Sequence, residues 1–410
     1  MRRYAVALAV LIIVAAAGVA AWLYQLQKGL IVTNMRNPFT WGLYIATWAF
    51  YVGTAAGGLV VSSAIYLFRV EKLKPIAPVA STTAFVFVIA AMLMILPDLG
   101  RPDRILNIIL HPQFKSMLVW DFIVLSTYAV LSATYTIILV RPNWAKRKGL
   151  PEDKIEKIKR NSERWARILA PISLPFAILI HTVTAWVLAT QLSRPWWYGG
   201  LLAPMFIAAA LTTGPTVVIL ASLIVHGFKD ELRETYRFLA KISAASAAVM
   251  LFLYYNDFVV RAWWSKGEEY EALRMVFTDY ISIHLGEVLL VLAGLVVLAK
   301  YYNSLSGLVT GSLLVNIGVF LHRYLLVPPA YNLIPFRLTV VSGAESYEWA
   351  YPIALGEIRG TLTDPGPVFV NYWPYVPSPI EITITIGAFA LISAILLILL
   401  KILPLKKEGA

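Results

Sequence analysis

The sequence predicts an all-α protein that crosses a membrane about ten times, as two four-helix bundles flanked by a first and a last helix. Of its 410 residues, 59% are apolar and only 14% are charged, and the mean hydropathy is +0.71. Soluble domains carry about 25% charged residues and cannot bury this much apolar surface. Lipid is therefore the solvent of most of the chain, which leaves no room for a large soluble domain.

Ten apolar stretches are long enough to cross a bilayer, which takes about 20 helical residues. The first follows Met1-Arg2-Arg3, as in a signal peptide, but its apolar run is long and no small-x-small cleavage motif follows it. We therefore expect a retained anchor helix. The expected spans lie near residues 5–24, 41–68, 79–97, 118–140, 168–190, 201–226, 238–258, 280–300, 306–327 and 380–403.

The distribution of positive charge predicts the orientation. With both termini on the inner side, about two thirds of the 35 Lys and Arg residues fall on that side. Because such residues are retained in the cytoplasm, we expect a multi-pass protein of the cell membrane with both termini cytoplasmic. Segment 141–167 is the longest inner loop, expected as an amphipathic surface helix or a solvated linker. The net charge of +12 reflects this orientation rather than nucleic-acid binding.

The chain contains signs of an internal repeat. The second and sixth spans can be overlaid so that Trp41-Gly42 falls on Tyr198-Gly199 and Gly57 falls on Gly214. The two copies are separated by four spans, so the repeat is parallel rather than inverted. This predicts an anchor helix at 1–36, a first bundle at 37–190, a second bundle at 191–327, an outer loop at 328–379, and a last span with an inner tail at 380–410.

Ionisable side chains within a bilayer cost about 3 kcal/mol or more, so each needs an explanation. Asp98, Asp257 and Glu381 stand at helix ends, where caps or rim salt bridges can explain them. Asp121 and Glu287 lie deeper, and we expect them to handle protons. The residues in the outer half or at its rim are Asp98, Asp121, Asp257, His284, Glu287, His322, Arg323 and Glu381, with His181 nearer the middle.

The second span carries an aromatic stripe formed by Trp41, Tyr44, Trp48 and Tyr51. An interfacial belt explains Trp41, but Trp48 and Tyr51 are too deep for it. They either pack the bundle or line a pocket for a planar ring. A quinone is a planar ring of this kind. Its two-electron reaction also moves two protons, so a quinone site needs an apolar slot for the ring, hydrogen-bond donors to the carbonyls and a route to water. The stripe and the outer ionisable groups supply these ingredients.

The chain has no cysteine, which excludes disulfides, thiolate zinc sites and cysteine-ligated iron–sulfur clusters within it. Two interpretations stay open for His181 and His322: a structural hydrogen bond, or donation to a quinone carbonyl with proton transfer near neutral pH. Any haem would need ligands from the five histidines, which are His111, His181, His226, His284 and His322.

Four stretches carry a resemblance to a known family. Residues 37–58 read NPFTWGLYIATWAFYVGTAAGG, residues 96–122 read LPDLGRPDRILNIILHPQFKSMLVWDF, and residues 180–186 read IHTVTAW. Together they resemble the NrfD/PsrC family of integral membrane subunits in polysulfide reductase-like complexes. Residues 375–392, YVPSPIEITITIGAFALI, are similar to the longer ten-helix, HybB-like members. The resemblance covers most of the chain from about residue 37 to 400.

The resemblance implies a respiratory subunit with no metal that reacts with a quinone, of the menaquinone type, near the outer face. It would not be catalytic alone. It would exchange electrons with a ferredoxin-like iron–sulfur subunit and, through it, with a catalytic subunit for sulfur compounds or hydrogen. Its other partner would be membrane lipid, not nucleic acid. By position, the resemblance assigns the quinone pocket to Tyr44, Trp48, Asp121 and His181. Acid–base roles fall to Asp121, His181, Asp98, Glu287 and Asp257.

Other interpretations stay open. A secondary transporter would place its site near the midplane at broken helices, and Gly214-Pro215 is the best candidate for such a break. A haem b subunit would use His181 and His322, and a structural anchor would have the fold without a quinone site. The outer loop 328–379 is rich in Pro, Trp and Tyr, which favours an ordered docking surface for a partner.

Overall fold

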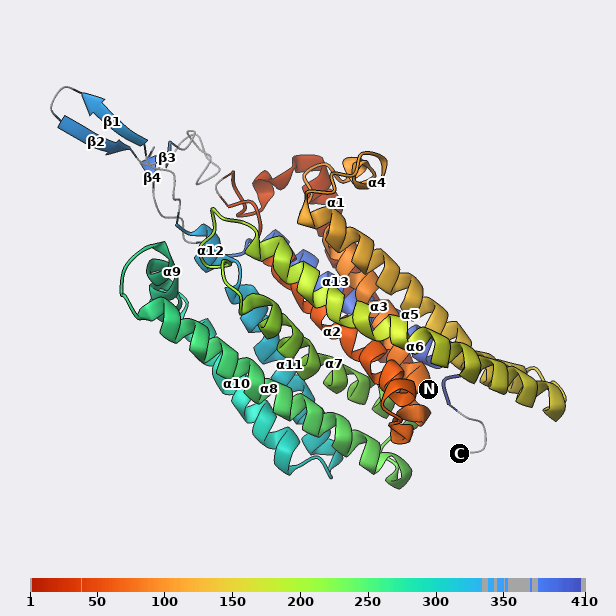
Figure 1. Cartoon of the computed structure of the whole chain (residues 1–410). Coiled ribbons are helices and arrows are strands. Elements are labelled where there is room, and N and C mark those ends of the chain that lie inside the picture. Colours follow the sequence, from red (N-terminus) through yellow and green to blue (C-terminus); the bar gives the residue numbers. More distant parts are fainter. Residues whose placement is uncertain are drawn as a thin grey trace.

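The chain is an all-α protein of membrane type, and the prediction of ten spans is confirmed (Figure 1). The computed structural model describes residues 2–37, 39–333, 338–342, 345–349, 351–352, 369–370 and 375–406. The long helices within these residues are α1 (Arg2–Lys28), α2 (Leu43–Leu67), α3 (Ala77–Met94), α5 (Met117–Arg147), α6 (Glu152–Ala189), α7 (Leu202–His226), α8 (Arg233–Ala262), α10 (Ile281–Lys300), α11 (Leu305–Leu325) and α13 (Pro379–Ile402).

Short elements connect these helices. Three short α-helices and four short strands gather at one end of the molecule, and the N-terminus lies at the other (Figure 1). The strands form two antiparallel pairs, β1 with β2 and β3 with β4. Most of the expected docking loop 328–379 lies outside the described residues. The short elements are α4 (Asn107–Leu110), α9 (Glu268–Phe277), α12 (Pro328–Tyr331), β1 (Leu338–Ser342), β2 (Glu345–Trp349), β3 (Tyr351–Pro352) and β4 (Phe369–Val370), with 3-10 turns at Leu30–Val32, Glu71–Ile76, Pro102–Arg104 and Asp230–Leu232.

The long helices pack in three groups. Helices α2, α3, α5 and α6 contact one another as a first four-helix bundle, and α7, α8, α10 and α11 form a second. Helix α1 packs along α13, where Gly18 meets Gly387. Helices α2 and α7 join the bundles, and Gly57 meets Gly214 at their contact. The parallel repeat that aligns these two glycines stays a prediction.

Segment 141–167 is not a separate loop, which corrects the sequence-based expectation. Helix α5 continues to Arg147, and α6 starts at Glu152 and runs without interruption into the membrane span. Gly149, at a φ of 68°, makes the turn between them. The charges favour this arrangement because Lys146 and Arg147 lie at a helix C-terminus, whereas Glu152 and Asp153 lie at an N-terminus.

Helix α7 is continuous through Gly214-Pro215, from Leu202 to His226. The helix break that a transporter site would need at this position is therefore not there. The proline removes one backbone donor without ending the helix, and the absence of a side chain at Gly214 admits α2 at this level.

Candidate functional site

A chain of hydrogen bonds links α1, α2 and the end of α3 near the rim of the molecule opposite the N-terminus (Figure 1). The Tyr44 hydroxyl donates to Gln25 Oε1 at 2.6 Å, and Gln25 Nε2 donates to the carbonyl oxygen of Pro97 at 2.7 Å. Gln25 is only 3% exposed and Tyr44 is fully buried. Because these bonds are buried, they fix the position of Pro97 and of Asp98 next to it.

Asp98 lies at the same rim and has an unpaired carboxylate oxygen in the described part of the chain. Its side chain is half-buried, and its Oδ1 is enclosed with no hydrogen bond among the described residues. Arg101, three residues further along the chain, pairs with Asp103 at 2.8 Å on the surface and not with Asp98. Burial raises the pKa of Asp98 well above its ordinary value, and the nearby charge of Glu381 raises it further. This carboxyl group can therefore hold a proton at pH values where an exposed aspartate cannot.

Glu381 is a helix cap, as its position at a helix end predicts. Its Oε2 accepts from the backbone of Ser378 at 2.9 Å, while its own backbone donates to Ser378 Oγ at 3.2 Å, which is a capping box. The backbone of Asn34 also donates to Oε2, at 2.8 Å. Its Oε1 accepts from the Tyr375 hydroxyl, which accepts in turn from the backbone of Leu43 at 2.9 Å. These bonds tie α13 to the start of α2.

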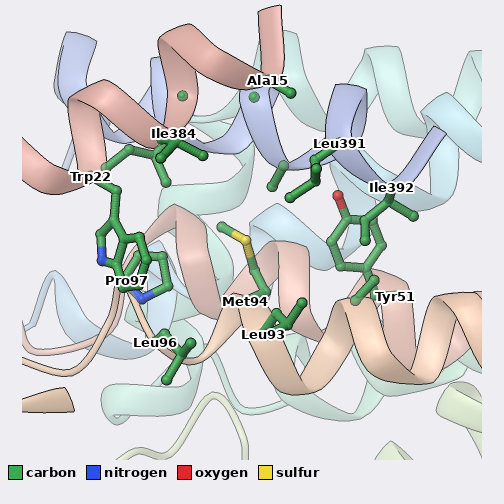
Figure 2. Close-up of a pocket in the computed structure, with 15 residues that line it drawn as sticks. Ala15, Trp22, Tyr51, Leu93, Met94, Leu96, Pro97, Ile384, Leu391 and Ile392 are labelled. Carbon is green, nitrogen blue, oxygen red and sulfur yellow. The ribbon is translucent and has the colours of Figure 1, made fainter. Parts of the chain in front are cut away.

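A cavity of about 160 Å³ lies just below this rim, between α1, α2, α13 and the end of α3 (Figure 2). Its walls are almost entirely apolar, with Met94 and Ile384 among them, and Pro97 closes one side. The volume is several times the roughly 30 Å³ that one water occupies in the liquid. The close contact of Gly18 with Gly387 leaves space beside it because neither residue carries a side chain.

Two polar groups line this cavity, and they lie at opposite ends of it (Figure 2). Trp22 Nε1 of α1 and the Tyr51 hydroxyl of α2 are buried donors without a hydrogen-bond partner in the described part of the chain. The Tyr51 ring is held by Phe87 and Phe389, at centroid distances of 5.9 and 5.0 Å. A buried unpaired donor costs about 1–3 kcal/mol. A ligand acceptor that reached either donor would relieve this cost.

The interior of the first bundle holds a second polar group. The Thr184 hydroxyl donates to Asp121 Oδ1 at 2.6 Å, and both residues are buried. His181, one turn earlier on α6, is 2% exposed, and its two ring nitrogens have no partner among the residues described. Arg323 of α11 is fully buried between the bundles, with its guanidinium 3.8 Å from the Phe206 ring centroid. This group therefore keeps unused hydrogen-bonding capacity away from water.

The second bundle holds a buried cluster around Glu287. His322 Nδ1 lies 2.8 Å from Glu287 Oε1, and His284 Nδ1 lies 3.5 Å from Oε2. The Tyr254 ring packs edge-on against both imidazoles, at 4.7 and 5.9 Å. The structure thus places His322 in the second bundle and His181 in the first. The spacing of three residues between His284 and Glu287 places them on one face of α10, whereas His322 reaches them from α11.

Asp257 and Arg261 form the rim salt bridge that their spacing predicts. The distance from Arg261 Nε to Asp257 Oδ2 is 2.7 Å, and the guanidinium also donates to the carbonyl oxygens of Pro195 and Tyr198. A small cavity of about 20 Å³ is lined by this pair together with His322. It has room for about one water molecule, which would join the Glu287 cluster to the rim.

The structure distributes the site residues predicted from the sequence over separate places. Tyr44 faces Gln25 at the rim, whereas Asp121 and His181 lie inside the first bundle and do not line the cavity of Figure 2. Trp48 is buried with its indole nitrogen unpaired within the described chain. Whether these four residues bind one ligand stays a prediction.

Three residues of the site were missed by sequence reasoning. Trp22 and Gln25 lie three positions apart on α1, a helix expected only to anchor the chain, and Arg323 was given no role. A Trp and a Gln on one face of an otherwise aliphatic span are the signal that could have found the first two.

Known proteins resemble this chain along its length. It is 30% identical to a putative dimethyl sulfoxide reductase membrane subunit of Halobacterium salinarum, over 98% of this chain and 92% of the relative. It is 25% identical to a selenate reductase subunit of Mesobacillus selenatarsenatis, over 78% and 81%. An Hdr-like menaquinol oxidoreductase integral membrane subunit of Archaeoglobus fulgidus is 25% identical over 50% of this chain and 47% of its own length.

The sequence model of the family described as polysulphide reductase, NrfD, matches residues 31–335, which is most of the chain and includes both four-helix bundles. The resemblance seen in the sequence motifs is thereby confirmed, and the chain belongs to the NrfD family of polysulphide reductases.

Proposed function

We propose that this chain is the quinone-reactive membrane subunit of a multi-subunit reductase. The observation that carries the proposal is the apolar cavity with the unpaired donors of Trp22 and Tyr51 at its two ends (Figure 2). A para-quinone is a planar apolar ring with an acceptor oxygen at each end. The cavity is bordered by the lipid-facing helices α1 and α13, so a lipid-soluble ring can reach it from the bilayer.

A bound quinone supplies two-electron chemistry that takes up two protons on reduction and releases two on oxidation. The residues of this chain bind and orient the ring and move those protons. Trp22 Nε1 and the Tyr51 hydroxyl donate to the two oxygens, and Met94 with its apolar neighbours excludes water. Asp98 follows Pro97 in the cavity wall and is half-exposed, so its carboxyl group can pass protons between the cavity and the outer aqueous phase.

Tyr44 and Gln25 act as positioning residues in this proposal because their hydrogen bonds fix the Pro97–Asp98 segment. Asp121 and His181 handle protons from the bundle interior, where Thr184 holds the carboxylate. In the second bundle, Glu287 and His322 exchange protons with the rim at Asp257 through the small cavity between them. Trp48 contributes aromatic packing beside the site.

The electrons come from outside this chain, because a subunit without cysteine cannot ligate the usual iron–sulfur clusters. We propose a ferredoxin-like iron–sulfur subunit that docks at the outer end, near the strands and α12, and links to a catalytic subunit. The relatives support this arrangement, since two of them are named as subunits of reductases and one as a menaquinol oxidoreductase subunit. Both termini lie on the cytoplasmic side of the cell membrane in this proposal.

Quinol-linked and dye-linked turnover of the purified complex test the proposal. Trp22→Phe and Tyr51→Phe each remove one donor and keep a ring, so each should lower the quinol-linked rate by about 3- to 10-fold, the worth of one hydrogen bond. The dye-linked rate, which bypasses this subunit, should not change. Trp264→Phe and Tyr255→Phe are matched controls because both rings are exposed. Quinol-linked rates that match wild type in both cavity variants would contradict the proposed site.

A haem b subunit is the alternative that spectroscopy decides. It would require His181 and His322, but His322 already contacts Glu287 inside the second bundle. A Soret band in the purified complex that is lost in His322→Ala would establish haem there, and its absence would remove this alternative.

A further inference from the structure

A second and larger cavity lies at the end of the molecule that carries the N-terminus (Figure 1). Its volume is about 590 Å³, and four helices contribute to it. Tyr4 comes from the start of α1, Arg147 from the end of α5, Val225 from the end of α7 and Lys401 from the end of α13. It shares no lining residue with the cavity of Figure 2.

The charge of this cavity is of one sign. Arg147, Lys401 and Lys406 line it, and no acidic residue does. All three are exposed, and none forms an ion pair with a carboxylate of the described residues. Elsewhere at this end, exposed cations do find acids, as Lys74 does with Glu71 at 2.5 Å. Three unpaired cations around one hollow form an anion-binding arrangement.

Contacts within the chain position two of the three cations and the segment that carries the third. Asn143 Nδ2 donates to the carbonyl oxygen of Pro404 at 2.9 Å, and Arg147 Nη1 donates to that of Ile402 at 3.2 Å. These bonds fold the segment after α13 back onto α5, which brings Lys406 toward Arg147. Lys401 Nζ is placed 4.2 Å from the centroid of the Tyr4 ring.

The remaining walls of the cavity are apolar. Ile224 is 57% exposed, and Leu397 and Leu400 line the same cavity. Helix α5 has 31 residues and is therefore about 46 Å long, against a hydrocarbon thickness of about 30 Å. Arg147 in its last turn consequently lies at the level of the lipid headgroups. A ligand here meets cations at one end and hydrocarbon along its length.

We propose that this cavity binds one anionic phospholipid, with its phosphate against Arg147, Lys401 and Lys406 and its acyl chains along Ile224 and Leu397. Guanidinium and ammonium groups are the usual phosphate ligands in proteins. The bound lipid joins α1, α5, α7 and α13, and so connects the anchor pair of helices to both bundles. This site is independent of the quinone proposal.

Lipid binding to the delipidated, purified complex tests the inference. Native mass spectrometry would compare phosphatidylglycerol with phosphatidylcholine of the same acyl chains. The triple variant Arg147→Gln/Lys401→Gln/Lys406→Gln should bind phosphatidylglycerol about tenfold more weakly and phosphatidylcholine unchanged. The single variant Lys406→Gln, in the tail, should give a smaller loss in the same direction. The matched control Lys148→Gln/Lys154→Gln/Lys157→Gln removes equal charge from positions outside the cavity and should bind like wild type.

Three outcomes would overturn the inference. One is equal phosphatidylglycerol binding by the triple variant and wild type. A second is displacement of the lipid by millimolar inorganic phosphate, since a free anion needs no apolar wall. A third is an acidic partner protein that is lost from the complex in the triple variant while lipid binding stays the same. Co-purification of the other subunits with every variant, in the same ratio as with wild type, shows that the complexes compared are assembled.

Discussion

Gly57 of α2 and Gly214 of α7 meet backbone to backbone, so that a Cβ on either residue would overlap the other's Cα. These helices join the two bundles, and both are largely buried within the protein. Small residues permit such contacts in membranes, where apolar side chains gain little by leaving lipid. The contact between the bundles therefore depends on two positions without side chains.

Replacing Gly57 with Leu should destabilise the protein by more than about 3 kcal/mol, because the added side chain meets backbone that cannot yield. Gly53→Ala is the matched control on the same helix. Its added Cβ would meet only Arg323 Nη2 at 3.9 Å, and alanine favours the helix by about 1 kcal/mol. Thermal unfolding in detergent would compare the two variants, and equal midpoints would contradict the tight contact.

Asp98→Asn should change the pH dependence of stability in a defined direction. Because burial raises the folded-state pKa of Asp98 above 3.8, the folded chain keeps a proton that the unfolded chain releases. The proton on Asp98 therefore stabilises the folded wild type at low pH, and this stabilisation is lost as the pH rises from about 4 through the pKa of Asp98 in the folded chain. Asparagine does not titrate, so the variant lacks this loss. The difference between the unfolding midpoints, variant minus wild type, should therefore increase over this pH range. A difference that is constant with pH would show that Asp98 has an ordinary pKa.

Glu287→Ala should destabilise the second bundle by about 1–3 kcal/mol because it leaves His322 and His284 buried without their shared partner. Glu287→Gln keeps one acceptor and should cost less. If the cluster also carries protons, Glu287→Gln should slow proton release to the outer side by reconstituted complex while the electron-transfer rate in detergent stays the same. Unfolding midpoints equal to wild type in both variants would contradict the cluster geometry.

Tyr44→Phe should lower quinol-linked turnover by about 2- to 10-fold because Gln25 loses its donor and the Pro97–Asp98 segment is no longer fixed. His181→Ala should also lower this rate if the interior group handles protons. Dye-linked activity should be unchanged in both. If only His181→Ala lowers the quinol-linked rate, the quinone site would lie in the first bundle and not beside α1.

The spans were predictable because their signal is local. Each needs only a run of apolar residues, and the ten runs in the sequence became ten helices. The roles of Glu381 and of the Asp257–Arg261 pair were also predictable, since a capping box and an i,i+4 salt bridge involve neighbours in sequence.

Contacts between distant helices could not be derived from the same signal. Hydropathy identifies α1 only as an anchor. It gives no information on the cavity that Trp22 lines with α3 and α13, or on the hydrogen bond from Gln25 to the end of α3. The helical extension of α5 and α6 was missed for another reason: a charged stretch loses its apolar period whether it is a loop or a solvated helix. The approach of His322 to Glu287 likewise depends on how α11 packs against α10.

The most direct test of the quinone site is a cryo-EM map of the assembled complex with a bound quinone analogue. We expect ring density in the cavity between Trp22 and Tyr51, with its oxygens within hydrogen-bonding distance of Trp22 Nε1 and the Tyr51 hydroxyl. Ring density beside Asp121 and His181, with lipid filling the cavity between α1 and α13, would contradict the assignment.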